Sequence, residues 1–550
     1  MIRIATRGSA LALAQSRLVA ARLAAIGLPS ELVVRRTQGD AIVDRPFRQM
    51  EGKGFFTKEL EEALLAEEAE LAVHSLKDLP TEMPAGLTIA ATPEREDPSD
   101  VLVVRRERHD PRFALPVAPG SRVGTTSTRR RAQWIARRPD TTLVELRGNV
   151  PTRIEKLLRG EYDAIVIARA GIARLGADLS TLVAVRLDPR SFVPAPGQGA
   201  LAIEIRDDAR ELARSLLVLD DREVRAAVDA ERRVLALLGG GCLEPVGAFA
   251  RRRGESVVVD AVKGPPEEGV GPLRRARVEA PSFAHAAALA AERLGDPGSE
   301  VPGGLRGRTV ALTGQRGRFE LLARELEERG ARVLLAPLVE TVRDPAPEAT
   351  RALANALEFD ELAFTSATAV EAFVALAPAP VLAELRAGAG PRIAAIGVAT
   401  ADALLDAGLP VRRVADGSGG EALAGAIVRD AGAKRGRALL PGAHDGMPQL
   451  GESLARAGFD VVRAPIYRTR SSDDGEVERV RGERFDAAVI ASPSAVASFA
   501  KRRPFEAASF VAIGTTTLAA LADAGLEPRI ASRSPEPAAI ADAVASRTHD

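Results

Sequence analysis

An internal repeat in the second half of the chain restricts its possible folds more than any other feature of the sequence. Three blocks return once, in the same order: 312–341 as 440–469, 364–370 as 490–496, and 396–408 as 513–525. The first pair of blocks shares matched positions such as Ala336-Pro337 and Ala464-Pro465. Such a repeat indicates two similar structural units. We therefore expect two α/β lobes, with a cleft for a small ligand between them.

Each copy of the repeat has to pass from one lobe to the other. We place the crossings at 339–342 in the first copy and at 467–470 in the second. Because the two crossings occupy matched positions, we expect them to pair as a two-stranded hinge.

The first part of the chain alternates short apolar runs with helical patterns, which predicts mostly parallel α/β sheets. In its first unit, strands are expected at 1–6, 31–37 and 71–74, and helices at 9–26 and 57–68. In its second unit, strands are expected at 101–105, 122–125, 142–146 and 164–168. A smaller third unit at about 216–295 has a helix at 221–237 and strands near 246–250 and 257–262. A Gly- and Pro-rich linker follows, and a strand at 309–312 begins the second part.

Composition and charge exclude several classes of protein. Lys and Arg number 75 and Asp and Glu number 75, so the chain lacks the basic excess of a nucleic-acid binder. A single cysteine excludes an intramolecular disulfide and a zinc ribbon. No uncharged apolar run approaches the ~18–20 residues of a membrane span. Arginines interrupt the apolar stretch at 1–25, so we expect no signal peptide and a cytoplasmic protein.

The lone cysteine, Cys242, directly follows three glycines. Glycines leave a loop bare, so a bulky partner could reach the sulfur, and a thiolate is a strong nucleophile. A buried, small apolar side chain explains a lone cysteine equally well. The spacing alone leaves both readings open.

The segment His74-Ser-Leu-Lys-Asp-Leu-Pro80 follows a predicted strand, where open α/β sheets form their ligand crevice. Asp78 beside Lys77 is either an ion pair on a turn or a carboxylate that stabilises a developing cation. Arginines gather at other turns, and Gly124–Thr128 offers hydroxyls and backbone N–H groups that suit an anion. Any one arginine is explained by solvation, but several at successive turns favour a polyanionic small ligand.

In the second part, the turns carry hydroxyls in place of charges. They are Thr365, Ser366, Thr400, Ser492, Ser494, Thr515, Thr516 and Thr517. Helix capping explains each of them as well as function does. Neither a Ser-His-Asp constellation nor a metal-ligand spacing is present, so we expect no metal. If this part is an enzyme, it works by holding a reactive substrate in shape.

Collinear motifs through residues 1–295 resemble those of the hydroxymethylbilane synthase (porphobilinogen deaminase) family. They are Arg3-Ile-Ala-Thr-Arg7, Gly52-Lys-Gly-Phe-Phe-Thr-Lys-Glu-Leu60, the His74 segment, Glu94-Arg-Glu-Asp-Pro98, Gly124-Thr-Thr-Ser-Thr-Arg-Arg130, Leu146-Arg-Gly-Asn-Val150, Pro196-Gly-Gln-Gly199 and Gly240-Gly-Cys242. The repeat and Pro465-Ile-Tyr-Arg-Thr469 resemble the uroporphyrinogen-III synthase family over about 305–545. The chain thus resembles a fusion of two consecutive tetrapyrrole enzymes.

The resemblance implies an α/β fold with a three-domain deaminase followed by a two-lobed synthase unit. In the deaminase, two lobes like those of periplasmic binding proteins precede a small α+β domain that carries the cysteine. The implied division is 1–95 with 192–214, 96–191, 215–295, a linker at 296–304, and a synthase unit at 305–550 with lobe A at 305–339 and 470–550 and lobe B at 342–466.

For the deaminase, the resemblance implies that Cys242 holds a covalent dipyrromethane cofactor through a thioether. Four porphobilinogens then add in turn, each losing ammonia, and water releases linear hydroxymethylbilane. Asp78 matches the catalytic aspartate. Cofactor-binding positions match Lys77, Thr125, Ser127, Arg129 and Arg130, and substrate-binding positions match Arg3, Arg7, Ser9, Lys53, Arg147 and Arg153. The family's Arg-Gly-Asp segment reads Gln38-Gly39-Asp40 here, so the position before Gly39 is not assigned.

For the synthase, the resemblance implies closure of the tetrapyrrole with inversion of its last ring, ring D, and without a cofactor. Tyr467 matches a catalytic tyrosine near the connection of the lobes, and Thr400 and Thr516 match threonines that face the cleft. The expected partners are porphobilinogen and hydroxymethylbilane, with no nucleic acid and no membrane, and the expected state is a monomer.

A two-lobed protein that binds a polyanion without catalysis is the main alternative. Its lobes would look the same from the sequence. Cys242 distinguishes the two hypotheses, because a binding protein needs no thiol on a third domain.

Overall fold

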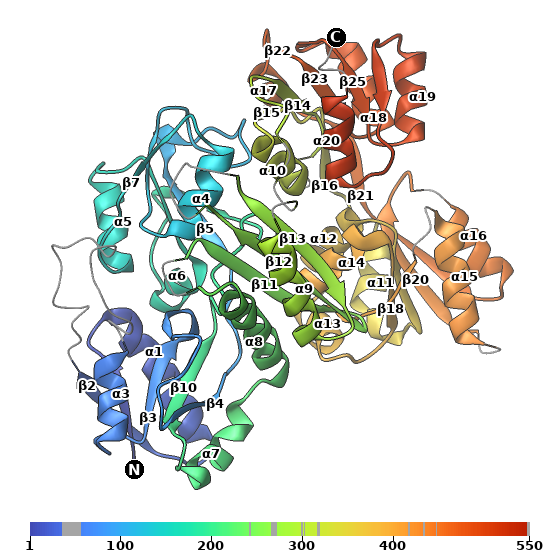
Figure 1. Cartoon of the computed structure of the whole chain (residues 1–550). Coiled ribbons are helices and arrows are strands. Elements are labelled where there is room, and N and C mark those ends of the chain that lie inside the picture. Colours follow the sequence, from blue (N-terminus) through green and yellow to red (C-terminus); the bar gives the residue numbers. More distant parts are fainter. Residues whose placement is uncertain are drawn as a thin grey trace.

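The computed structural model describes residues 1–35, 57–240, 244–265, 272–296, 298, 301, 303–315, 319–415, 419–432, 435–446 and 448–546. Cys242, Lys53 and Gln38-Gly39-Asp40, which the sequence analysis singled out, lie outside these residues. Figure 1 shows the chain passing from two α/β units on the left, through a central three-stranded sheet, to two further α/β units on the right.

The first sheet has the order β2-β1-β3-β10-β4. Its strands are β1 (Ile2–Arg7), β2 (Ser30–Arg35), β3 (Leu71–Ser75), β4 (Leu87–Ala91) and β10 (Leu201–Arg206), and its helices are α1 (Ala10–Ala25), α3 (Lys58–Leu65) and α7 (Arg210–Leu216). The Ser9 hydroxyl caps α1 by accepting from the Ala12 N–H at 3.3 Å. β10 runs antiparallel to both neighbours, so the sheet is mixed.

The second sheet has the order β7-β6-β8-β5-β9 and is also mixed, because β5 runs antiparallel to β8 and β9. Its strands are β5 (Asp100–Arg105), β6 (Arg122–Gly124), β7 (Thr142–Val144), β8 (Ala164–Ala168) and β9 (Leu182–Arg186), and its helices are α4 (Thr128–Arg137), α5 (Val150–Leu158) and α6 (Arg169–Leu175). The chain enters and leaves this unit through adjacent segments, where the Glu96 N–H donates to the Gly199 carbonyl at 3.2 Å. Gly199 has φ +90°, and a Cβ there would lie 2.3 Å from the Glu96 carbonyl oxygen. Only glycine fits this crossing.

The third unit is a three-stranded antiparallel sheet with two helices packed on one face. Its elements are α8 (Arg222–Leu237), β11 (Val246–Arg253), β12 (Ser256–Lys263), β13 (Arg274–Ala280) and α9 (Phe283–Gly295). Buried Glu231 on α8 ties this unit to the crossing segments. Its carboxylate accepts from Arg95 at 2.8 and 2.9 Å and from the Gly197 N–H at 2.8 Å.

The second part of the chain contains two larger sheets. One has the order β15-β14-β23-β25-β26, with β14 (Thr309–Leu312), β15 (Arg332–Leu335), β23 (Ala487–Ile490), β25 (Phe510–Ala512), β26 (Arg529–Ala531), α10 (Glu320–Glu328), α17 (Asp474–Glu478), α18 (Pro493–Arg502), α19 (Thr515–Asp523) and α20 (Pro537–Ala545). A small pair, β22 (Arg484–Phe485) and β24 (Glu506–Ala507), flanks it. We call this unit lobe A.

The other sheet has the order β16-β21-β20-β17-β18-β19 and forms lobe B. Its elements are β16 (Val339–Arg343), β17 (Glu361–Phe364), β18 (Arg392–Ile396), β19 (Val411–Ala415), β20 (Arg437–Ala443), β21 (Asp460–Ser471), α11 (Pro347–Ala354), α12 (Ala367–Leu376), α13 (Ala379–Arg386), α14 (Gly397–Asp406), α15 (Gly420–Ala431) and α16 (Gln449–Arg456).

The two crossings between the lobes pair as the repeat predicted. β16 runs antiparallel to the end of β21, with Val339 opposite Ser471 and Arg343 opposite Tyr467. The first half of β21 pairs with β20 inside lobe B instead. The ladder therefore changes partners at Tyr467, where the chain leaves lobe B. Within the described residues, no helix is long and apolar enough to cross a membrane.

Candidate active sites

The first candidate site lies where β3 ends. A 3-10 turn, Leu76–Asp78, follows this strand, and it leaves Asp78 exposed and Lys77 half-buried. The Lys77 ammonium donates to Gln198 Oε1 at 3.4 Å. Desolvation lowers the pKa of Lys77 to about 8; the nearby charges of Arg130 and Arg129 lower it further, while Asp78 and Asp100 oppose the shift.

Arg129 and Arg130 come from the first turn of α4, which the Ser127 hydroxyl caps by accepting from the Arg130 N–H at 3.4 Å. Both guanidiniums bind Asp100, at 2.8 Å from Arg129 and at 2.7 Å from Arg130. Burial opposes ionisation of Asp100, but the two guanidinium charges outweigh it and hold its pKa well below the ordinary value. Thr125, buried at the end of β6, accepts from the Ser127 N–H at 3.4 Å.

Arg153 on α5 completes what we call the cationic cluster: Lys77, Arg129, Arg130 and Arg153. Its Nε donates to the Gly148 carbonyl at 2.7 Å. Desolvation and the charge of Arg130 lower the pKa of Arg153 to about 10. Among the described residues, Asp100 is the carboxylate that pairs directly with this cluster. The site therefore carries an excess of positive charge that suits an anion with several carboxylates.

The remaining sequence-predicted residues lie in different settings. Arg3 forms an ion pair with Glu70 at 2.6 Å and would have to release it to reach a ligand. Arg7 is the half-buried last residue of β1, and Ser9 is the cap of α1. Arg147 lies 3.6 Å from Glu145. Cys242 and Lys53 lie outside the described residues.

Two residues at this site were missed by the sequence analysis. Gln198 Nε2 donates to Asp100 at 3.0 Å while its Oε1 accepts from Lys77, so it joins the two sheets. It sits between two glycines of the quoted Pro196–Gly199 motif, which was an available clue. Arg174 on α6 donates to the Gly199 carbonyl at 2.6 Å, and burial lowers its pKa. Nothing near it in the sequence sets it apart from other arginines.

The second candidate site is a cavity of about 390 Å³ in lobe B, at the ends of β17 and β20 and beside the middle of β21. Thr365, Ser366, His444, Arg463 and Tyr467 contribute its polar side chains. The Tyr467 side chain is largely buried, and its hydroxyl lies 3.2 Å from the Ser366 hydroxyl. Ser366 also caps α12 by accepting from the Ala369 N–H at 3.2 Å.

Thr400 and Thr516 do not line this cavity. Thr400 is buried in the first turn of α14 in lobe B, and Thr516 is exposed in the first turn of α19 in lobe A. The structure thus places one hydroxyl at the start of a helix in each lobe, and gathers Tyr467 and Ser366 in lobe B.

Two family models match successive parts of the chain. Residues 2–214 match "Porphobilinogen deaminase, dipyromethane cofactor binding domain", and residues 320–542 match "Uroporphyrinogen-III synthase HemD".

Curated relatives match the first part of the chain. A porphobilinogen deaminase of Syntrophobacter fumaroxidans is 49% identical over 252 residues, which are 46% of this chain and 80% of that protein. A porphobilinogen deaminase of a Roseiflexus species is 46% identical over 48% of this chain and 85% of its own length. Among solved structures, a mutant uroporphyrinogen III synthase of Thermus thermophilus is 24% identical over 43% of this chain and 96% of its own, with a TM-score of 0.28. The enzyme of Helicobacter pylori is 20% identical over 43% and 97%, with a TM-score of 0.32.

Proposed function

The chain belongs to the porphobilinogen deaminase family and carries a uroporphyrinogen-III synthase domain at residues 320–542, and on this premise we propose which side chains serve each reaction. It is a bifunctional enzyme of tetrapyrrole biosynthesis. It condenses four porphobilinogen molecules into hydroxymethylbilane with release of ammonia, and cyclises hydroxymethylbilane to uroporphyrinogen III with inversion of ring D. We call residues 1–295 the deaminase part and residues 305–550 the synthase part.

For the domains, we propose the division expected from the sequence. The deaminase part comprises 1–95 with 192–214, then 96–191, then 215–295, and the synthase part begins after the linker at 296–304. The sheets support this division, because β10 returns to the first sheet after the second sheet is complete. In the synthase part, strands that precede residue 342 in the sequence and strands that follow residue 466 belong to the same sheet, that of lobe A.

The residues of the cationic cluster fit a dipyrromethane cofactor, whose pyrroles carry acetate and propionate groups. Arg129 Nε is buried without a hydrogen-bond partner, and within the described residues Asp100 is the one carboxylate that forms an ion pair with any of the four cations of the cluster. Cys242 would hold the cofactor, and Lys77, Thr125, Ser127, Arg129 and Arg130 would surround it. When bound, the cofactor supplies the free pyrrole carbon on which the chain of pyrroles is extended.

Asp78 is the residue we propose as catalytic in the deaminase part. Loss of ammonia from porphobilinogen leaves a cation that is delocalised onto the pyrrole nitrogen. The Asp78 carboxylate is exposed on its short turn, next to the cationic cluster that would hold the substrate's carboxylates. A carboxylate fixed at that position stabilises the cation and accepts hydrogen bonds from pyrrole N–H groups. Substrate carboxylates would be held by Arg7, Ser9, Lys53, Arg147 and Arg153, and by Arg3 once freed from Glu70.

In the synthase part, we propose that Tyr467 acts on the substrate from the lobe B cavity, with the Ser366 hydroxyl orienting it. Thr400 and Thr516 would hold the substrate from opposite lobes. This arrangement supplies hydroxyl groups that can donate hydrogen bonds to the substrate. Catalysis would therefore come from holding the two ends of the linear tetrapyrrole in position for ring closure.

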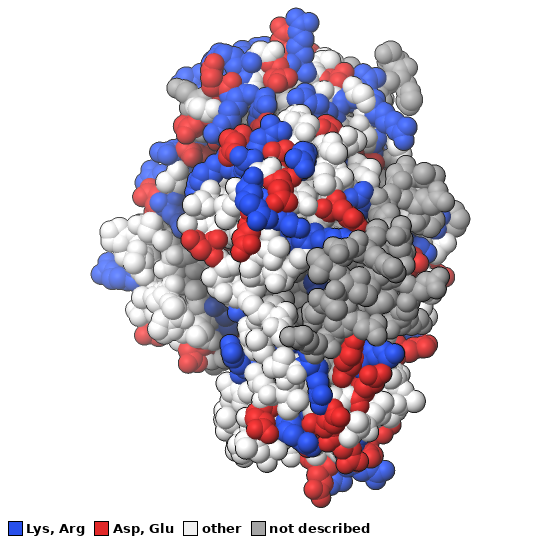
Figure 2. All heavy atoms as spheres, turned by 90° about the vertical axis from the view of Figure 1, so that its left-hand side faces the viewer, with Lys and Arg blue, Asp and Glu red and all other residues white. Residues whose placement is uncertain are grey.

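For its surroundings, we propose that the enzyme acts in the cytoplasm as a monomer, without nucleic acid or membrane. Basic and acidic side chains are interspersed over the face drawn in Figure 2. A face of mixed charge supports small-molecule substrates over a nucleic-acid partner.

The intact mass of the purified chain tests the cofactor assignment. We expect the protein to be heavier than its sequence by two covalently linked pyrrole units. Cys242→Ser should remove this extra mass, because the variant lacks the sulfur that forms the thioether. A polyanion-binding protein without catalysis would show the sequence mass in both samples.

A further inference from the structure

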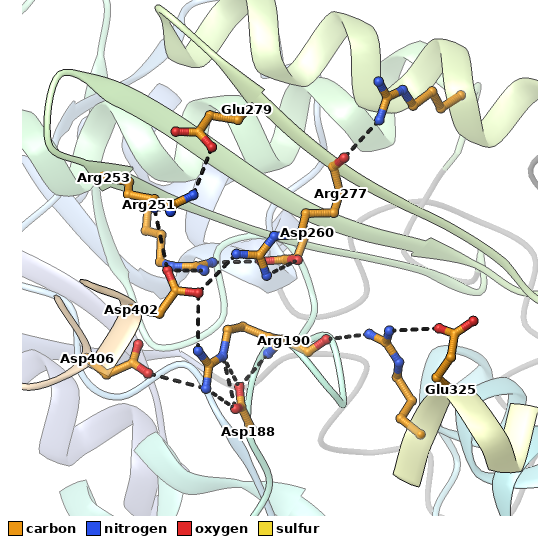
Figure 3. Close-up of polar contacts among 12 residues, drawn as sticks. Asp188, Arg190, Arg251, Arg253, Asp260, Arg277, Glu279, Glu325, Asp402 and Asp406 are labelled. Carbon is orange, nitrogen blue, oxygen red and sulfur yellow. Dashed lines mark hydrogen bonds and ion pairs between the residues drawn. The ribbon is translucent and has the colours of Figure 1, made fainter. Parts of the chain in front are cut away.

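The deaminase part and the synthase part meet at a network of ion pairs, drawn in Figure 3. At its centre is Asp402, which is 2% exposed and lies on α14 of lobe B. Four arginines of the deaminase part approach its carboxylate: Arg277 at 3.0 Å, Arg251 at 3.4 Å, Arg190 at 3.5 Å and Arg253 at 3.9 Å. Burial opposes ionisation of Asp402, but these charges outweigh it and lower its pKa. Asp402 is therefore an anchor of lobe B on the deaminase part.

Arg190 differs from the other three arginines because it also forms an ion pair with Asp406, at 3.6 Å, at the end of the same helix. Its guanidinium is held in place by Asp188 through hydrogen bonds of 3.0 Å from Nε. Its backbone carbonyl accepts from Arg324 of lobe A at 3.1 Å. One residue of the deaminase part thus contacts both lobes of the synthase part, as Figure 3 shows.

Lobe A is anchored separately. Arg137 on α4 pairs with Glu327 on α10 at 2.7 Å, and both side chains are 2% exposed. Arg275 on β13 pairs with Glu328 at 2.6 Å. Phe113 of the deaminase part is buried in the apolar core of lobe A. These contacts fix lobe A on the same body that holds lobe B.

The direct connection between the lobes is small compared with the contacts that join each lobe to the deaminase part. Within the described residues, the chain passes between them at β16 and β21, which pair only with each other beyond Tyr467. An isolated two-stranded ribbon is marginally stable and bends readily. The angle between the lobes is therefore set by the body to which both are anchored.

We propose that the deaminase part positions the two lobes of the synthase part for ring closure, and that Arg190 is the positioning residue that spans them. The inference rests on the proposed function, because it concerns the reaction of the synthase part. Ring closure requires both ends of a long, flexible substrate to be held at once, by hydroxyls that lie on different lobes. A small change in the lobe angle would misplace these groups, and misplacement by about 1 Å can cost ~100-fold in rate.

The test compares wild type with Arg190→Gln in the full-length protein. The substitution removes the guanidinium contacts with Asp402 and Asp406 of lobe B and keeps the backbone contact with Arg324 of lobe A. We expect the ratio of type III to type I product to fall about tenfold, while porphobilinogen consumption is unchanged. The fold should persist, because Asp402 keeps Arg251 and Arg277 as partners. Arg225→Gln is the matched control, since Arg225 forms a similarly half-buried pair with Asp220 inside the deaminase part. It should leave the ratio unchanged.

Two further measurements separate positioning from general destabilisation. Cysteines introduced at exposed Glu348 in lobe B and Arg484 in lobe A allow spin labels to report the distance between the lobes. We expect a narrow distribution in wild type and a broader one in Arg190→Gln. Asp406→Asn should give part of the same effect and add little to Arg190→Gln, because the two residues act through one contact.

An unchanged isomer ratio and an unchanged distance distribution in Arg190→Gln would overturn the inference. Equal losses in Arg225→Gln would do the same, because they would show a general effect of removing an arginine. If wild type itself makes only the type I isomer, the proposed function of the synthase part is wrong. If wild type makes type III and Arg190→Gln makes it in the same ratio, only the proposed role of Arg190 is wrong.

Discussion

Asp78→Asn should lower porphobilinogen turnover by about 10²–10³-fold while the covalent cofactor stays attached. Asparagine keeps the size and the hydrogen-bonding oxygen of the side chain but removes its negative charge. The lost stabilisation falls on the cation that forms when ammonia leaves. Because Asp78 is exposed on its turn, the substitution creates no cavity and leaves no buried group without a partner.

The measurement is the steady-state rate of porphobilinogen consumption, with intact mass recorded on the same sample. Asp208→Asn is a matched control, because Asp208 is an exposed carboxylate of the same domain that pairs only with Arg206 in the described structure. It should retain wild-type turnover. Near-normal turnover in Asp78→Asn would show that the carboxylate does not take part in the reaction.

Removing the synthase part should convert the product entirely from the type III to the type I isomer. Hydroxymethylbilane released without the second enzyme closes spontaneously, and spontaneous closure does not invert ring D. A chain that ends at residue 304 exposes Phe113, which is 4% exposed in the intact protein. Phe113→Ser in the truncated chain therefore keeps the uncovered surface polar.

Porphobilinogen consumption by this truncated chain should match that of the intact enzyme, because the cationic cluster and Asp78 lie wholly within the deaminase part. The products are separated as isomers after oxidation to porphyrins. Type III formation at the intact level by the truncated chain would show that ring inversion does not reside in residues 305–550.

Single helices and strands were predicted well, because their hydrophobic periodicity and capping residues lie within a few residues of one another in the sequence. The strand expected at 309–312 is β14 with the same bounds, and the helix expected at 9–26 is α1 with Ser9 as its cap. Strand direction was not predictable in the same way. The first two sheets of the deaminase part are mixed because β10 and β5 run antiparallel to their neighbours. The alternation of strands and helices along the sequence does not show in which direction a strand runs when it returns to a sheet after a long excursion.

The charge of the deaminase site was predicted, but its organisation was not. Arginines at successive turns indicated a polyanionic ligand, and Lys77, Arg129 and Arg130 do lie together. Asp100 forms ion pairs with the two arginines, but it is the first residue of an apolar strand. In the sequence it therefore looks like the polar residue that marks the start of a strand. The contact of Arg190 with Asp402 joins residues far apart in the chain, and no local pattern marks either of them.

Supplying porphobilinogen to the purified wild-type chain, and identifying the isomer it makes, tests the central claim most directly. We predict that the single polypeptide consumes porphobilinogen, releases ammonia and yields uroporphyrinogen III without any added enzyme. Consumption with only the type I isomer would contradict the assignment of the synthase part. Tight binding of porphobilinogen with no consumption would contradict the account as a whole.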